Sequence, residues 1–96
     1  MRGLNERENQ VIARWHARQE AKAIHYDIAE LRGRRLSARL LLTALVKRTE
    51  IARQLGYRET ERRLQNRMGV VQARLNTLNR KIAELQRMAE VLENKE

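Results

Sequence analysis

The chain has 96 residues, of which 21 are lysine or arginine and 12 are aspartate or glutamate, so its net charge at pH 7 is +9. It lacks cysteine, which excludes disulfides, thiolate catalysis and cysteine-type zinc sites, and it lacks proline. This length favours one folded domain over residues 1–96, and the abundance of Ala, Leu, Arg, Glu and Gln predicts an all-α protein.

Hydropathy gives no indication of a membrane protein. No window reaches the roughly 18 consecutive apolar residues that a spanning helix needs, and the first ten residues lack the apolar core of a secretory signal. A basic amphipathic helix can lie on a membrane surface, but Gln and Asn flank the longest apolar seam here and large aromatic residues are missing from it. We therefore expect a cytoplasmic protein with no membrane partner.

A first helix is predicted over about residues 5–32. Asn5 and Glu8 have the spacing of a capping box at its start. Gly33 is typical of the position just past a helix end, because glycine adopts the left-handed conformation required there without strain.

The apolar residues of this first helix fall on two nearly opposite faces. One face carries alanine, isoleucine and leucine side chains between Ala13 and Leu31 and is predicted to face the core. The other carries Val11, Ile12 and Trp15. Since tryptophan is enriched at the centres of protein interfaces, this second face is a candidate protein-docking surface, and packing within the chain is the alternative.

A second helix is predicted over about residues 38–55. The short link at residues 33–36 favours a tight antiparallel turn, and Ser37 is a suitable N-cap. The segment LLLTALV is apolar on most sides, so this helix is expected to be the most buried of the bundle. It is predicted to end before Gly56.

The longest periodic stretch lies in a third helix, predicted over about residues 58–94. Its apolar residues are separated by alternating steps of four and three, which is the heptad pattern of a coiled-coil seam. The seam consists of Leu64, Met68, Val71, Leu75, Leu78, Ile82, Leu85, Ala89 and Leu92.

Together these elements predict a three-helix, coiled-coil-like bundle with a long protruding C-terminal helix. In an up-down-up arrangement the third helix would extend roughly 25–30 Å beyond the first, because the second is short. The protruding part would expose its apolar seam to water. We therefore expect a homodimer or a hetero-oligomer to form through Leu78, Ile82, Leu85, Ala89 and Leu92.

One segment resembles part of a helix-turn-helix DNA-binding unit. The text Glu-Ile-Ala-x-x-Leu-Gly-Tyr at residues 50–57 is similar to the first helix and turn of that unit, in which an Ile-Ala pair and a leucine pack inside and glycine makes the turn. The resemblance covers about twelve residues. It ends where a recognition helix needs an apolar residue, because Arg62 and Arg63 stand there instead.

The excess positive charge is concentrated in the middle of the chain. Residues 32–67 carry eleven basic and three acidic side chains, and most of the basic ones are arginine. The planar guanidinium group suits both phosphate and carboxylate, so a nucleic-acid backbone, an acidic protein surface and a merely solvated basic face all remain open. The candidate binding residues are Arg32, Arg34, Arg35, Arg39, Arg53, Arg58, Arg62, Arg63, Arg67 and Arg74.

Catalytic chemistry has little support in the sequence. His16 and His25 are not accompanied by a recognisable third metal ligand, and neither a Ser-His-Asp pattern nor a glycine-rich phosphate loop is present. We expect no enzyme activity, no cofactor and no metal. The leading expectation is a nucleic-acid-binding accessory subunit or small regulator that uses backbone contacts. The alternatives are an adaptor or inhibitor, such as those encoded by phages or plasmids, and a divergent helix-turn-helix regulator.

Overall fold

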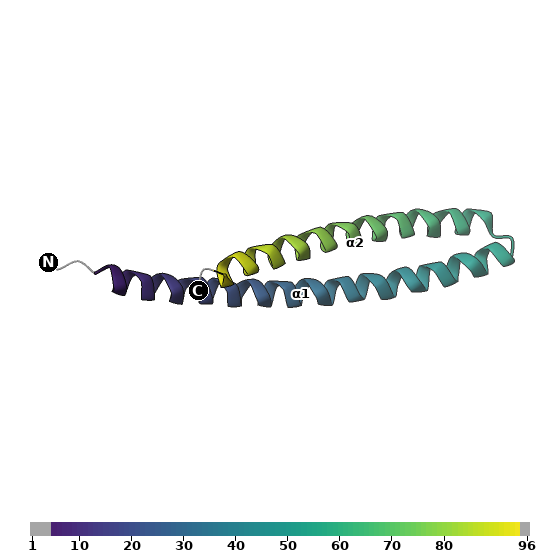
Figure 1. Cartoon of the computed structure of the whole chain (residues 1–96). Helices are drawn as coiled ribbons and strands as arrows, with labels where there is room; N and C mark the ends of the chain where they lie inside the picture. The colour runs from purple at the N-terminus through teal and green to yellow at the C-terminus, as the bar shows by residue number, and fades with distance from the viewer. Residues whose placement is uncertain (1–4, 95–96) are drawn as a thin grey trace.

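The protein is an antiparallel helical hairpin built from two long helices. The computed structural model describes residues 5–94, so the ends of the predicted domain, residues 1–4 and 95–96, lie outside it. Helix α1 spans Glu6–Gln54 and helix α2 spans Arg58–Glu93, and the two run side by side over most of α2 (Figure 1). The all-α prediction is confirmed for the described residues. The three-helix bundle is wrong, because the first two predicted helices are one.

The predicted break at Gly33 does not occur. Gly33 and Ser37 are both helical and exposed, and the ion pair between Arg34 and Glu30 spans consecutive turns at 2.8 Å. A glycine inside a helix costs about 1 kcal/mol relative to alanine. That cost is small beside the packing that a turn at this point would remove, because the apolar seam keeps the same phase on both sides of Gly33.

This seam of α1 runs through both predicted helices in steps of four and three, without interruption. Its residues are all buried or half-buried, and they are Ala17, Ala21, Ile24, Ile28, Leu31, Arg35, Ala38, Leu42, Leu45, Thr49 and Ala52. Two members are polar. Arg35 reaches across to donate a hydrogen bond to Asn79 of α2 (3.2 Å), and the Thr49 hydroxyl donates to the Leu45 carbonyl (2.7 Å). These two polar residues make the seam hard to recognise in the sequence. Their hydrogen bonds satisfy the polar atoms within the seam, and this makes polar side chains tolerable at those positions.

Helix α2 follows its sequence prediction closely. The predicted bounds were 58–94, and the heptad seam from Leu64 to Leu92 is buried or half-buried along its length. The centre of the hairpin core combines Val71 and Leu75 from α2 with Ala38 and Leu45 from α1, and Leu45 is 0% exposed. The core therefore lies between the two helices, and both contribute to it.

The predicted oligomerisation seam is covered by α1 of the same chain. Ile82 and Ala89 are only 3% and 1% exposed in the isolated chain, Leu78 is also buried, and Leu85 and Leu92 are half-buried. The reason given for a dimer at these residues, an apolar seam protruding into water, is therefore wrong. Self-association as such stays a prediction, which light scattering can measure.

The helix that protrudes is α1. The ion pair between His25 and Glu93 (2.6 Å) joins the two helices near the end of α2, and packing on α2 reaches Ala21, which is 5% exposed. The roughly 15 residues of α1 before Ala21, about 22 Å in length, extend beyond α2 (Figure 1). The predicted capping box opens this segment: Asn5 Oδ1 accepts a hydrogen bond from the Glu8 backbone N–H at 2.8 Å. That part of the prediction is confirmed.

Three residues, 55–57, turn the chain back between the helices. Gly56 has φ +75°, a left-handed conformation that glycine adopts without strain. The turn differs from a helix-turn-helix unit in two respects. The helices pack antiparallel along their length, whereas that unit crosses its helices at about 90–120°. Ile51 and Leu55, the residues that would pack inside, are both exposed.

Candidate anion-binding groove

The heptad positions beside the two seams bring basic side chains together along one side of the hairpin. In an antiparallel pair the g positions of both helices face the same side. The g positions in the middle of the hairpin are occupied by arginine or lysine, except for Leu41. We call this row the basic groove, and its cations are Arg34 and Arg48 of α1 and Arg67, Arg74 and Lys81 of α2.

Contacts across the hairpin fix how these cations are aligned. The Arg35–Asn79 hydrogen bond and the contact of the Thr49 hydroxyl with the Met68 sulfur (3.3 Å) set the antiparallel register. Residues whose numbers sum to about 115 therefore lie level with one another. This places the cations of the basic groove at three levels, which are Arg34 with Lys81, Arg74 opposite Leu41, and Arg48 with Arg67.

Most of these cations have no carboxylate partner in the part of the chain that the structure describes. Arg34 is paired with Glu30, but within residues 5–94 no carboxylate lies at ion-pair distance from Arg48, Arg67, Arg74 or Lys81. All four are exposed. Unpaired, solvated cations keep their full attraction for an external anion, because no internal pair has to be broken first.

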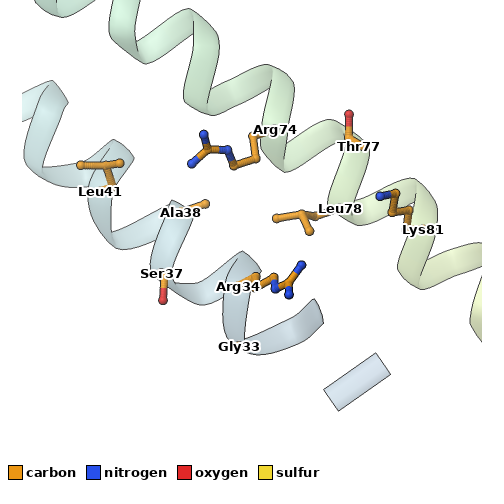
Figure 2. A pocket seen from close by; sticks show the side chains of 9 residues that line it. All are labelled: Gly33, Arg34, Ser37, Ala38, Leu41, Arg74, Thr77, Leu78 and Lys81. Carbon is orange, nitrogen blue, oxygen red and sulfur yellow. The ribbon is translucent and has the colours of Figure 1, made fainter. Parts of the chain in front are cut away.

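A cavity of about 750 Å³ opens in the floor of the basic groove. It is flanked by Arg34 on one helix and by Arg74 and Lys81 on the other (Figure 2). The hollow arises because α1 presents small residues there: Gly33, Ser37 and Ala38 follow one another at steps of four and one. A negatively charged group entering it would be within reach of cations from both helices.

The candidate arginines from the sequence divide between several places. Arg34, Arg67 and Arg74 lie in the basic groove, whereas Arg32 and Arg39 occupy the e positions on the other side of α1. Arg35 is half-buried in the seam. Arg48 and Lys81 were not among the predicted binding residues. Lys81 follows Arg67 and Arg74 at seven-residue steps, and this spacing could have identified it.

The remaining candidates, Arg53, Arg58, Arg62 and Arg63, lie near the turn. Arg53 pairs with both Glu50 (3.2 Å) and Glu61 (2.8 Å), and Arg63 pairs with Glu59 (2.8 Å). The hydrogen bond to Glu61, together with the charges of Glu61 and Glu50, raises the pKa of Arg53 above its ordinary value. These internal pairs occupy two of the four arginines near the turn. Arg58 and Arg62 are exposed and have no carboxylate at ion-pair distance within residues 5–94, but they lie outside the basic groove.

The candidate docking residues lie on the free segment of α1. Val11, Ile12 and Trp15 are exposed, with Trp15 at 57%, and the indole ring contacts the His16 ring edge-on at a centroid distance of 5.1 Å. The alternative that Trp15 packs on a helix of its own chain is therefore wrong. The three apolar side chains form a surface separate from the basic groove.

Metal sites, membrane-spanning helices and similarity to known proteins were the remaining possible indications of function. Within residues 5–94 no group of three or more His, Asp or Glu side chains is placed to hold a metal ion, and no helix there is long and apolar enough to cross a membrane. No protein-family model, curated protein or solved structure matches the chain.

Proposed function

We propose that this protein binds the phosphate backbone of nucleic acid along the basic groove, as a non-enzymatic accessory subunit or small regulator of a nucleoprotein complex. The observation that carries the proposal is the alignment of five cations on one side of the hairpin, four of them without a carboxylate partner among the described residues. Binding through phosphates supplies affinity and little sequence preference.

The spacing of the cations fits a polyanion better than a single small anion. Residues seven apart on a helix are separated by about 10.5 Å, so the three levels of the basic groove cover about 21 Å. A ligand must therefore carry negative charge over a comparable length to use all five cations. A nucleic-acid strand does so with every nucleotide.

The test is a titration of labelled duplex DNA, single-stranded DNA and RNA at about 50 and 200 mM salt. If about four phosphates are neutralised, the logarithm of affinity falls with the logarithm of salt with a slope of about −3, so affinity drops roughly 60-fold over this range. The double variant Arg67→Gln with Arg74→Gln removes two of the cations. For single-stranded DNA, the slope of the logarithm of affinity against the logarithm of salt should therefore fall in magnitude by about 1.4.

A matched control removes the same charge from another face of the same helix. Arg80 and Arg87 occupy f positions of α2, away from the basic groove. The double variant Arg80→Gln with Arg87→Gln should retain most of the affinity and the parent slope. If both double variants lose affinity equally, general charge rather than the basic groove attracts the ligand. If the parent protein binds none of the three nucleic acids at 50 mM salt, the proposal is wrong.

The exposed surface of the free α1 segment favours a second candidate function, an adaptor or inhibitor that docks on an acidic surface of a larger assembly. Apolar Val11, Ile12 and Trp15 would anchor the contact, and arginines at positions 7, 14 and 18 accompany them on the same segment. When this protein is the bait in pull-down experiments, the Trp15→Ala variant should lose the partner. The Tyr26→Ala variant should keep it, because Tyr26 is an exposed aromatic residue elsewhere on the same helix. Equal retention by both baits would reject this candidate.

A further inference from the structure

We propose that the basic groove receives a single nucleic-acid strand, phosphates inward and bases outward, and that one phosphate seats in the cavity between Arg34, Arg74 and Lys81. The inference rests on the proposed function and narrows its ligand from nucleic acid in general to a flexible, unpaired strand.

The width of the basic groove is the first argument. Packed helices have axes about 8–10 Å apart, and the cations rise from both of them along one shared furrow. A single backbone fits between two such rows and can be contacted from both sides. A duplex is much wider than the furrow, so it can only touch the rims with the outer edge of one strand.

The straightness of the basic groove is the second argument. The three levels of cations lie on one line because both helices keep their heptad phase, and they extend over about 21 Å. An unpaired strand can straighten to follow all three levels. A strand within a duplex winds around the helix axis and leaves a straight furrow after a short stretch, so it reaches fewer of the five cations.

The cavity is the third argument, because it makes room for a group to enter between the helices. Ala38 and Leu78 point toward each other between the helices and form part of its floor, whereas the hydroxyls of Ser37 and Thr77 point away from the facing helix at its outer edges (Figure 2). Cations of both helices therefore flank a recess of about 750 Å³. A phosphate is small enough to enter it, and the guanidinium groups can donate paired hydrogen bonds to its oxygens.

The positions of the aromatic residues decide which way the bases face. Single-strand-binding proteins that take bases inward stack them on aromatic side chains. The aromatic residues of this chain are Trp15, Tyr26 and Tyr57. Trp15 lies on the free segment, Tyr57 at the turn and Tyr26 on the outward face of α1, and none of them lines the cavity. The bases of a strand held in the basic groove would therefore point to solvent and stay available for pairing.

The first experiment compares three probes at 50 mM salt: a labelled 16-nucleotide oligothymidylate, a 16-base-pair duplex, and inorganic polyphosphate as an unlabelled competitor. We expect the single strand to bind at least about tenfold more tightly than the duplex, because it can reach all five cations. Polyphosphate should displace it at a similar phosphate concentration, since no base is contacted. Duplex binding as tight as single-strand binding would overturn the inference and leave the proposed function standing. Binding to neither would overturn both.

The second experiment fills the cavity without changing the charge. Leu41 lines the cavity at the g position opposite Arg74, so Leu41→Trp should place an indole ring in the recess and weaken oligothymidylate binding about tenfold. Thr43→Trp is the control, because Thr43 is exposed on α1 but does not line the cavity. Circular dichroism melts establish that both variants are folded. Unchanged binding by folded Leu41→Trp, or equal losses in both variants, would show that the cavity does not seat the phosphate.

Discussion

Replacing Leu45 by alanine tests the central structural finding, that one uninterrupted seam of α1 packs on α2. Leu45 is 0% exposed and belongs to the cluster with Ala38, Val71 and Leu75. The substitution removes three carbon atoms, worth about 2.4 kcal/mol in lost burial at ~0.8 kcal/mol each. The cavity left behind adds to this cost, but in a core only two helices thick the neighbours can partly close it. We expect a total loss of about 3 kcal/mol.

A thermal melt followed by circular dichroism at 222 nm measures this effect. For a domain of this size, about 3 kcal/mol corresponds to a fall in Tm of roughly 12–24 °C. Leu40→Ala is the matched control, since it makes the same chemical change on the same helix at a side chain that is 63% exposed. It should change stability by less than about 0.5 kcal/mol. If Leu40→Ala destabilises as much as Leu45→Ala, the assignment of inner and outer faces of α1 is refuted.

Three further substitutions test particular features of the hairpin by the same melts. Gly33→Ala should raise stability by up to about 1 kcal/mol, because Gly33 is inside α1 and a Cβ there meets nothing within 4 Å; a decrease would indicate a turn at this point. Gly56→Ala should lower stability by about 1–2 kcal/mol, because its φ of +75° is strained for alanine, and an unchanged Tm would contradict that conformation. Arg35→Leu should stabilise the hairpin by about 1 kcal/mol, because an apolar side chain replaces a half-buried cation in the seam; a lower Tm would mean that its bond to Asn79 outweighs this gain.

The parts of the fold that sequence predicted correctly are those in which local and long-range signals agree. Helix α2 combines an unbroken heptad seam with a glycine turn before it, so both its bounds and its inner face were predictable. The capping box of Asn5 and Glu8 depends only on a spacing of three. Both features are short-range or strictly periodic, and nothing in the tertiary structure competes with them.

The break at Gly33 was predicted wrongly because a local signal was given more weight than the seam. Gly33, followed by two arginines, a leucine and then Ser37, is typical of a helix end and a new helix start, yet the heptad positions before and after it are in phase. Arg35 and Thr49 stand at two of those positions, and polar residues there made the continuity hard to recognise. Packing against α2 decided the outcome, since a turn at Gly33 would have placed the two halves of the seam out of register.

The error at Gly33 also determined which basic residues could be grouped correctly. Arg67 and Arg74 can be grouped from the sequence alone, because they lie seven residues apart on one predicted helix. Arg48 could not be joined to them, because its position relative to α2 depends on α1 being a single helix. Grouping cations from two helices requires the register between them, and contacts such as Arg35–Asn79 become known only with the structure.

Because the helices are antiparallel, the turn at residues 55–57 joins them at one end of the hairpin, the closed end, and they are not joined at the other, the open end. At the closed end Arg53 meets Glu61 across 8 residues of chain, whereas at the open end His25 meets Glu93 across 68. Because the entropy cost of closing a loop grows with its length, contacts near the turn can form first, and each layer shortens the free chain that the next must close. Opening runs in the reverse direction. Amide hydrogens should therefore exchange progressively more slowly from the open end toward the core around Leu45. Local stability against opening thus increases along the hairpin in that direction.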